Sequence, residues 1–243
     1  MMSIQEKELT LKCLQSGEIT VEGRFMWGSN YTFLCQIQDD VCSLQAVYKP
    51  TRGERPLWDF PSESLAGREV AAYLISEAGG WYMVPPTVLR EDGPAGTGSL
   101  QLFVDHDPEH HYFNFSAEEK GRLQPVALFD VVINNTDRKG GHIIFDENDH
   151  IWLIDHGVCF HIHPKLRTVI WDFAGQPISE EYLQQIVSLK EKLAPGQETY
   201  QELSRYLTSE EIRAVIARID GLLRTGVFPR PSDRRYSYPW PPV

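Results

Sequence analysis

Two carboxylates flank a short predicted β-hairpin in the second half of the chain, and this pattern constrains the fold more than any other feature. Asp137 lies in a glycine-containing loop, DVVINNTDRKGGH (residues 130–142), directly after a predicted helix. Asp155 directly follows the apolar run 151–154. Pairing of that run with residues 142–145 across the turn-like sequence DENDH brings both carboxylates to one mouth of a cleft. Phosphoryl transfer needs such a pair, because one carboxylate must lie near the acceptor hydroxyl and another must hold the metal that bridges the phosphates.

Five strands and one helix are predicted for the first half of the chain. The strands are expected at residues 17–26, 31–38, 43–49, 84–89 and 99–104. The first three are joined by short polar turns, which favours an antiparallel meander. The last two are separated by the glycine-rich turn EDGPAGTG. Apolar residues recur at helical spacing over residues 64–78, so a helix is expected there, ending at a glycine pair.

Helices are predicted to dominate the second half. Ser116 opens a capping box, SAEE, before a helix that is expected to run to about Ile133 with a break near Pro125. Ser179 and Thr208 are predicted caps of later helices, and Thr208 stands in a second capping box, TSEE. The proline-rich end, FPRPSDRRYSYPWPPV, is expected to form an extended strap or a loose tail. The chain is therefore predicted to be α+β, with a sheet-rich part followed by a helix-rich part.

A family resemblance rests on four short motifs that occur in the same order. The string NNTDRKGGH resembles the Asn-x-Asp-Arg catalytic loop of phosphatidylinositol 4-kinases and their relatives, and IDHG resembles their Ile-Asp-x-Gly metal site. Upstream, Lys49 in VYKP and Glu69 in GREVAAYLIS stand where the family keeps its phosphate-binding lysine and the partner glutamate. The chain is thus similar to the phosphatidylinositol 3/4-kinase-like superfamily, in a mainly actinobacterial-type branch.

The resemblance implies a fold and its division into parts. It implies a two-lobed protein-kinase-like fold with an antiparallel-sheet N-lobe, containing one helix, at residues 1–98. A hinge that contacts adenine is implied at residues 99–105. The mostly helical C-lobe, with the catalytic hairpin and the proline-rich tail, is implied at residues 106–243.

The resemblance also implies roles for individual residues. Asp137 orients or deprotonates the acceptor, and Lys139 neutralises charge on the transferred phosphoryl group. Asp155 is the main metal ligand, and Lys49 with Glu69 forms the pair that grips the phosphates. The other implied nucleotide contacts are the covering turn, Gly28, Ser29 and Asn30, and the hinge residues Gln101, Leu102, Phe103 and Val104. The implied cofactors are ATP and Mg²⁺, with Mn²⁺ as an alternative.

One residue departs from the family pattern. Five residues after Asp137 the family normally has Asn, whereas this chain has His142, which is then the candidate for the second metal position. Imidazole suits magnesium poorly and manganese or zinc better, so that position is expected to be altered, weakened or absent. A pseudokinase that binds nucleotide as a scaffold for a partner protein therefore stands as an alternative to an active kinase.

Composition restricts the acceptor and the partners. The net charge of −11 disfavours nucleic acid and anionic membranes. No apolar run approaches the roughly 18 residues of a membrane-spanning helix, the N-terminus lacks the layout of a signal peptide, and the four cysteines form no C-x-x-C pair. We expect a cytoplasmic kinase that transfers the γ-phosphate of ATP to a hydroxyl of a soluble protein or small molecule, with a protein partner left open.

The histidines suggest a third reading, a metal-dependent hydrolase. They form two clusters, HDPEHH with His106, His110 and His111, and DHGVCFHIH with His156, His161 and His163. Against this reading, the chain lacks the repeated strand-helix alternation of a metal-hydrolase barrel. His156 fits better as the variable residue inside the Asp-x-Gly motif.

Overall fold

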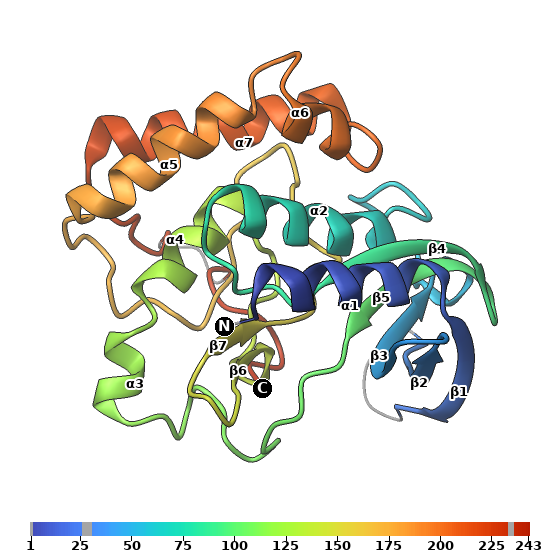
Figure 1. Cartoon of the computed structure of the whole chain (residues 1–243). Coiled ribbons are helices and arrows are strands. Elements are labelled where there is room, and N and C mark those ends of the chain that lie inside the picture. Colours follow the sequence, from blue (N-terminus) through green and yellow to red (C-terminus); the bar gives the residue numbers. More distant parts are fainter. Residues whose placement is uncertain (1, 26–30, 233–235) are drawn as a thin grey trace.

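A five-stranded antiparallel sheet forms most of the first lobe (Figure 1). The structure, a computed structural model, describes residues 2–25, 31–232 and 236–243. The sheet has the strand order β1-β2-β3-β5-β4. Its strands are β1 (Glu18–Arg24), β2 (Phe33–Gln38), β3 (Ser43–Pro50), β4 (Thr87–Gly93) and β5 (Gly96–Leu102). The predicted meander of the first three strands is confirmed.

The hairpin of β4 and β5 begins later in the chain than the sequence predicted, and its turn is shorter. β4 begins at Thr87 rather than at residue 84, because the two prolines that precede it have no backbone N–H to give to the sheet. Pairing then continues to Gly93 and Gly96, so only two residues form the turn. β5 ends at Leu102, so residues 99–102 of the predicted hinge belong to the sheet.

Helix α1 (Ile4–Ser16), which the sequence analysis did not predict, covers one face of this sheet. Its buried Cys13 and Leu14 pack with residues that alternate along the strands, among them Ala46 and Tyr48 of β3. Because side chains alternate across a strand, Lys49 lies on the opposite face of β3. The side of the sheet that carries Lys49 therefore faces away from α1.

Helix α2 (Leu65–Ala78) joins the two lobes. It is buried along most of its length and contacts β4 and β5 of the sheet as well as α4, α5 and α6 of the second lobe. Arg68 near its start donates a hydrogen bond to the carbonyl of Cys159 and forms an ion pair with Glu211. Because both lobes hold this helix, the backbone of Glu69, the residue after Arg68, has little freedom to move.

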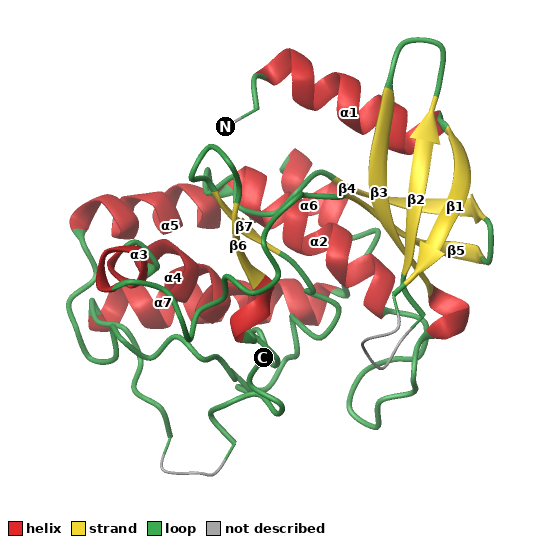
Figure 2. Ribbon diagram, turned by 90° about the horizontal axis from the view of Figure 1, so that it is seen from below, coloured by secondary structure: helices red, strands yellow, loops and turns green. Residues whose placement is uncertain are grey.

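The second lobe is mostly helical, as predicted (Figure 2). Its elements are α3 (Ala117–Gly121), α4 (Gln124–Ile133), β6 (Ile143–Phe145), β7 (Ile151–Leu153), α5 (Glu180–Lys192), α6 (Glu198–Leu203) and α7 (Ser209–Thr225). Both predicted capping boxes are present, at Ser116 and Thr208, and Ser179 caps α5. The predicted break falls between α3 and α4, where Pro125 occupies the first turn of α4.

The hairpin of β6 and β7 places the two predicted carboxylate loops at the same end. Ile143 pairs with Leu153 and Phe145 with Ile151, so the residues just before β6 and just after β7 lie side by side. The predicted two-lobed α+β architecture is thus confirmed. No helix in the described ranges is long and apolar enough to cross a membrane.

Candidate functional site

Lys49 connects the two lobes through two carboxylates. Its Nζ lies 2.5 Å from Oε1 of Glu69 on α2 and 3.0 Å from Oδ1 of Asp155, which follows β7. Burial alone would lower the pKa of Lys49, but the charges of Asp155 and Glu69 raise it instead. The side chain of Lys49 is therefore protonated and positively charged at the junction of the lobes.

Asp155 has a constrained backbone and an accessible side chain. Its φ is +61°, in the left-handed region that non-glycine residues seldom adopt. Strain of this kind persists only where the surroundings hold it, and it is common at functional sites. Half of the side chain is exposed, and the charge of Lys49 holds the pKa of Asp155 well below its usual range. An ionised, half-exposed carboxylate is available to a cation.

Asp137 lies opposite, on the loop after α4. Its Oδ2 is 3.5 Å from Nζ of Lys139. Burial raises the pKa of Asp137 to about 6, with a further rise from Asp155, while Lys139 and Arg167 oppose the shift. A carboxylate with a pKa near neutrality is suited to exchange a proton with a hydroxyl group.

Four of the predicted residues line one cavity. Lys49, Glu69, Asp137 and Asp155 border it, together with residues of the sheet, the start of α2 and the segment after β7. The additional lining residues are Tyr31, Pro50, Glu54, Leu65, Ala66, Ser99, Gly157 and Val158. The structure thus gathers the four predicted residues in one cleft between the lobes, although Lys49 and Asp155 are 106 positions apart in sequence.

Arg138 is the main residue of the site whose role the sequence analysis missed. Its guanidinium is fully buried, forms an ion pair with Asp130 at 3.0 Å and donates hydrogen bonds to the carbonyls of His142 and Ile154. Those carbonyls lie in the loop after Asp137 and directly before Asp155. Arg138 therefore holds the loops that carry Asp137 and Asp155 against each other, and the Asp-Arg dipeptide was its only local signal.

His156 continues this network toward α2. Arg138 can only donate, so Nε2 of His156, 2.9 Å from Nη2 of Arg138, must accept. The neutral ring then carries its proton on Nδ1, which faces Oε2 of Glu69 at 3.8 Å, and the backbone N–H of His156 donates to the same oxygen at 2.8 Å. Burial lowers the pKa of His156, which agrees with a neutral ring.

His142 lies beside Asp155 but faces it with a nitrogen that carries a proton. Burial lowers the pKa of His142 to about 4, so its ring is neutral at pH 7. Its Nδ1 is 3.5 Å from the backbone nitrogen of Lys139, which can only donate, and its Nε2 is 3.4 Å from Oδ2 of Asp155. In this tautomer His142 donates toward Asp155. To act as the second metal ligand it would have to present an unprotonated nitrogen.

The residues predicted to contact adenine lie in different surroundings. Gln101 is buried in β5, where its side-chain amide donates to Thr87, and Leu102 packs against the core under α1. The backbone N–H of Phe103 donates to Gln45, and the carbonyl of Val104 contacts Nδ1 of His106. The predicted covering turn, Gly28, Ser29 and Asn30, lies outside the described residues.

The histidine clusters do not form a metal centre in the described part of the chain. No group of three or more His, Cys, Asp or Glu side chains is placed there to hold a metal ion. His110 instead pairs with Glu119, and the ring of His161 packs against Phe60. The metal-dependent hydrolase reading thus has no ligand cluster among these residues.

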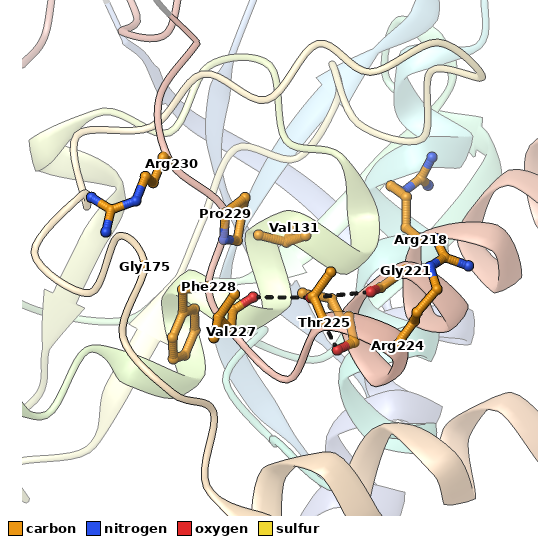
Figure 3. Close-up of a pocket in the computed structure, with 11 residues that line it drawn as sticks. Val131, Gly175, Arg218, Gly221, Arg224, Thr225, Val227, Phe228, Pro229 and Arg230 are labelled. Carbon is orange, nitrogen blue, oxygen red and sulfur yellow. Dashed lines mark hydrogen bonds between the residues drawn. The ribbon is translucent and has the colours of Figure 1, made fainter.

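A second hollow, a groove of about 660 Å³, lies at the end of α7 (Figure 3). It is lined largely by apolar groups such as Val131 and Phe228, and its lining also includes Arg218, Arg224 and Arg230. No carboxylate borders it, and it shares no residue with the cleft around Lys49. In Figure 3 the guanidinium of Arg230 points away from the other two arginines.

Comparisons with solved structures define the class of protein. The chain resembles the Golgi casein kinase with Mn/ADP bound, with a TM-score of 0.57, 14% sequence identity, and coverage of 92% of this chain and 76% of that one. It also resembles the Helicobacter pylori proinflammatory kinase CtkA, with a TM-score of 0.52, 11% identity, and coverage of 88% and 94%. The protein has a two-lobed kinase-like fold.

Sequence comparisons identify the family. The chain is 41% identical to Protein Rv2133c of Mycobacterium tuberculosis over 94% of this chain and 93% of that protein, and it belongs to the same family. It is 33% identical to phosphatidylinositol 4-kinase gamma 4 of Oryza sativa subsp. japonica and 30% identical to phosphatidylinositol 4-kinase gamma 7 of Arabidopsis thaliana. Those matches cover 50% of this chain and about a quarter of each plant protein. No protein-family model matches the chain.

Proposed function

We propose that this protein is an ATP-dependent phosphotransferase of the phosphatidylinositol 3/4-kinase-like superfamily. The observation that carries the proposal is the position of Lys49 between Glu69 and Asp155, in one cavity with Asp137. A cation on the phosphates, a carboxylate for a metal and a carboxylate for the acceptor are the groups that phosphoryl transfer needs.

The residues fit ATP with a divalent cation. Magnesium is usually held in proteins by one or two carboxylates together with substrate phosphates, and Asp155 offers a half-exposed, ionised carboxylate for that purpose. Bound there, the cation would neutralise negative charge on the phosphates. His142 is the candidate for a second ligand, and its imidazole favours manganese over magnesium. Lys49 would bind the phosphates, and Glu69 keeps its side chain in place.

Asp137 and Lys139 are assigned to the acceptor side. Asp137, with a pKa of about 6, would orient the acceptor hydroxyl and take its proton as the oxygen attacks the γ-phosphoryl group. Lys139 would neutralise charge on that group while it is transferred. We infer that the acceptor is a soluble protein or small molecule and that the protein works in the cytoplasm, because the net charge of −11 disfavours an anionic membrane.

A nucleotide-binding scaffold without transfer is the second candidate function. The residue that favours it is His142, whose protonated nitrogen faces Asp155 where the family has a neutral oxygen donor. The position of Asp137 favours transfer, because a nucleotide-binding scaffold has no need for a carboxylate of raised pKa in the cleft that holds Lys49 and Asp155.

One experiment separates the two functions. Binding of ATP to the purified protein is measured by calorimetry with Mg²⁺ and then Mn²⁺, followed by incubation with γ-labelled ATP. Metal-dependent binding with label transferred to the protein or to an added soluble fraction supports the phosphotransferase. Metal-dependent binding without transfer supports the scaffold. Absence of binding with both metals would exclude both functions.

A further inference from the structure

The last described residues of the chain, 236–243, lie against the loop that carries Asp137, and we name this segment the C-terminal strap. Its first anchor is Ser237, whose side chain is buried. The carbonyl of Ser237 accepts hydrogen bonds from the backbone N–H of Thr168, at 3.2 Å, and from Nε1 of Trp171, at 3.1 Å. The ring of Tyr238 packs against Trp171. The strap is thus fixed at its beginning.

The second anchor is Pro242. Its carbonyl accepts a hydrogen bond of 2.8 Å from the backbone N–H of Gly140, three residues after Asp137. The carbonyl of Gly140 accepts from the N–H of Tyr112, so both backbone groups of this glycine are used. Gly140 and Gly141 would otherwise be flexible, because glycine has the largest backbone freedom to lose.

The two anchors hold the loop that carries Asp137 at two positions. Thr168, which the strap holds through Ser237, forms a parallel bridge with Arg138, and its side chain reaches Asp130 at 3.4 Å. Gly140 is held through Pro242. Asp137 directly precedes Arg138, so the segment from Asp137 to Gly140 is fixed at one end by Thr168, which the strap supports, and at the other by the strap itself.

We propose that the C-terminal strap is a positioning element of the active site, which keeps Asp137 in place for the acceptor through the Pro242–Gly140 hydrogen bond. The role in turnover rests on the proposed phosphotransferase function. The contact itself does not, and it can be tested alone. None of the strap residues borders the cleft around Lys49, so the strap acts on the acceptor side and leaves nucleotide binding unchanged.

Two truncations form a matched pair. A chain that ends at Pro242 loses only Val243 and keeps the accepting oxygen in its terminal carboxylate. A chain that ends at Pro239 loses Pro242 but keeps Ser237 and Tyr238 with their contacts to Thr168 and Trp171. Hydrogen exchange of the peptide that contains Gly140 reports on the contact directly. We expect at least tenfold faster exchange in the chain that ends at Pro239, and parental exchange in the chain that ends at Pro242.

A point substitution removes the donor without shortening the chain. Gly140 begins a 3-10 turn after Lys139, whose backbone is extended with a ψ of 165°, a conformation that proline tolerates in the residue before it. Gly140→Pro removes the N–H and places its ring in the space of the hydrogen bond to Pro242. A Cβ at this position, in Pro or in Ala, lies 3.0 Å from the ring of Phe113, so Gly140→Ala keeps the N–H and is the control for that contact. If truncation at Pro239 unfolds the protein, the comparison of Gly140→Pro with Gly140→Ala tests the hydrogen bond to Pro242 instead.

Turnover completes the test. Phosphate transfer at saturating ATP is expected to fall at least tenfold in the chain that ends at Pro239 and in Gly140→Pro relative to their controls, while calorimetric affinity for ATP stays within twofold. Equal hydrogen exchange in the matched chains, or equal turnover in an active protein, overturns the proposal. If the parent transfers no phosphate, the phosphotransferase function fails, and hydrogen exchange still decides whether the strap holds the loop.

Discussion

Arg138 and Asp130 form an ion pair in which neither side chain is exposed, with Nη2 3.0 Å from Oδ1. The same guanidinium donates to the carbonyls of His142 and Ile154, on the two loops that carry Asp137 and Asp155. Removal of two charges from water is costly, so such a pair contributes more to the choice of one conformation than to net stability. Its position between the loops makes it the structural centre of the site.

Loss of one partner of this pair should be severe. Arg138→Leu leaves the carboxylate of Asp130 buried without its cation, and we expect a loss of about 3–5 kcal/mol in the free energy of unfolding. Chemical denaturation monitored by tryptophan fluorescence measures it. The double variant Arg138→Leu with Asp130→Leu removes the stranded charge and should recover part of the loss. A double variant as unstable as the single one would show that the pair is not the cause.

The proposed metal role of Asp155 can be tested separately from its backbone conformation. Asn tolerates the left-handed conformation of this residue, so Asp155→Asn changes the charge and keeps the φ of +61° accessible. We expect the variant to lose metal-dependent affinity for ATP, measured by calorimetry with and without Mg²⁺. Asp149 is the matched control, because it also has a φ of +60° but lies on the exposed hairpin turn. Retained metal dependence in Asp155→Asn would remove Asp155 from the metal site.

The parts of the fold that the sequence predicted are those with local signals. The capping boxes at Ser116 and Thr208 predict the starts of their helices, because a cap and its partner are only three residues apart and can be recognised in the sequence. Helix α1 carries the same signal, a capping box between Ser3 and Glu6, so it could have been predicted and was overlooked. The β-rich runs likewise predicted the meander, with errors of a few residues at strand ends.

The four residues that line the cleft, Lys49, Glu69, Asp137 and Asp155, could be selected from the sequence, but the residues that support them could not. Asp137 and Asp155 stand in short motifs, and Lys49 with Glu69 follows from their order along the chain. The burial of Arg138, by contrast, depends on packing of segments that are distant in sequence, and no local pattern encodes it. The contact between Gly140 and Pro242 joins residues about a hundred positions apart, and a proline-rich end alone does not indicate what it touches.

Asp137 should set the acidic limb of the activity profile. Its pKa of about 6 means that the free enzyme loses the required carboxylate form as the pH falls through 6, so kcat/KM should decline below that value. Lys139 lowers this pKa, and Lys139→Met should move the limb to higher pH in addition to slowing transfer. Kinetics of labelled phosphate transfer between pH 5 and 8 give both curves. An acidic limb at the same pH in both proteins would assign the limb to another group.

Turnover should depend on Asp137 far more than binding does. Asp137→Asn keeps the shape of the side chain but cannot take a proton, and we expect a loss of about 10²–10⁴-fold in kcat. Calorimetric affinity for ATP should change little, because Lys49 and Asp155 are untouched. A variant that transfers phosphate at the parental rate would exclude Asp137 as the acceptor-side carboxylate.

The stability of the protein should respond to Asp137 in the opposite direction to its activity. The pKa of Asp137 is raised from 3.8 to about 6 by burial, so the folded state favours the protonated form. This contribution to the free energy of unfolding is fully present below about pH 4 and is lost as the pH rises through 6.

Other groups titrate in the same range, so the quantity to compare is the difference in the free energy of unfolding between the parent and Asp137→Asn, whose side chain stays neutral at all pH values. Urea denaturation at pH 4, 5, 6 and 7 should show the parent losing stability relative to the variant over this interval. A constant difference would mean that Asp137 is as well solvated in the folded protein as in the unfolded chain, and its activity limb would then have to lie well below pH 6.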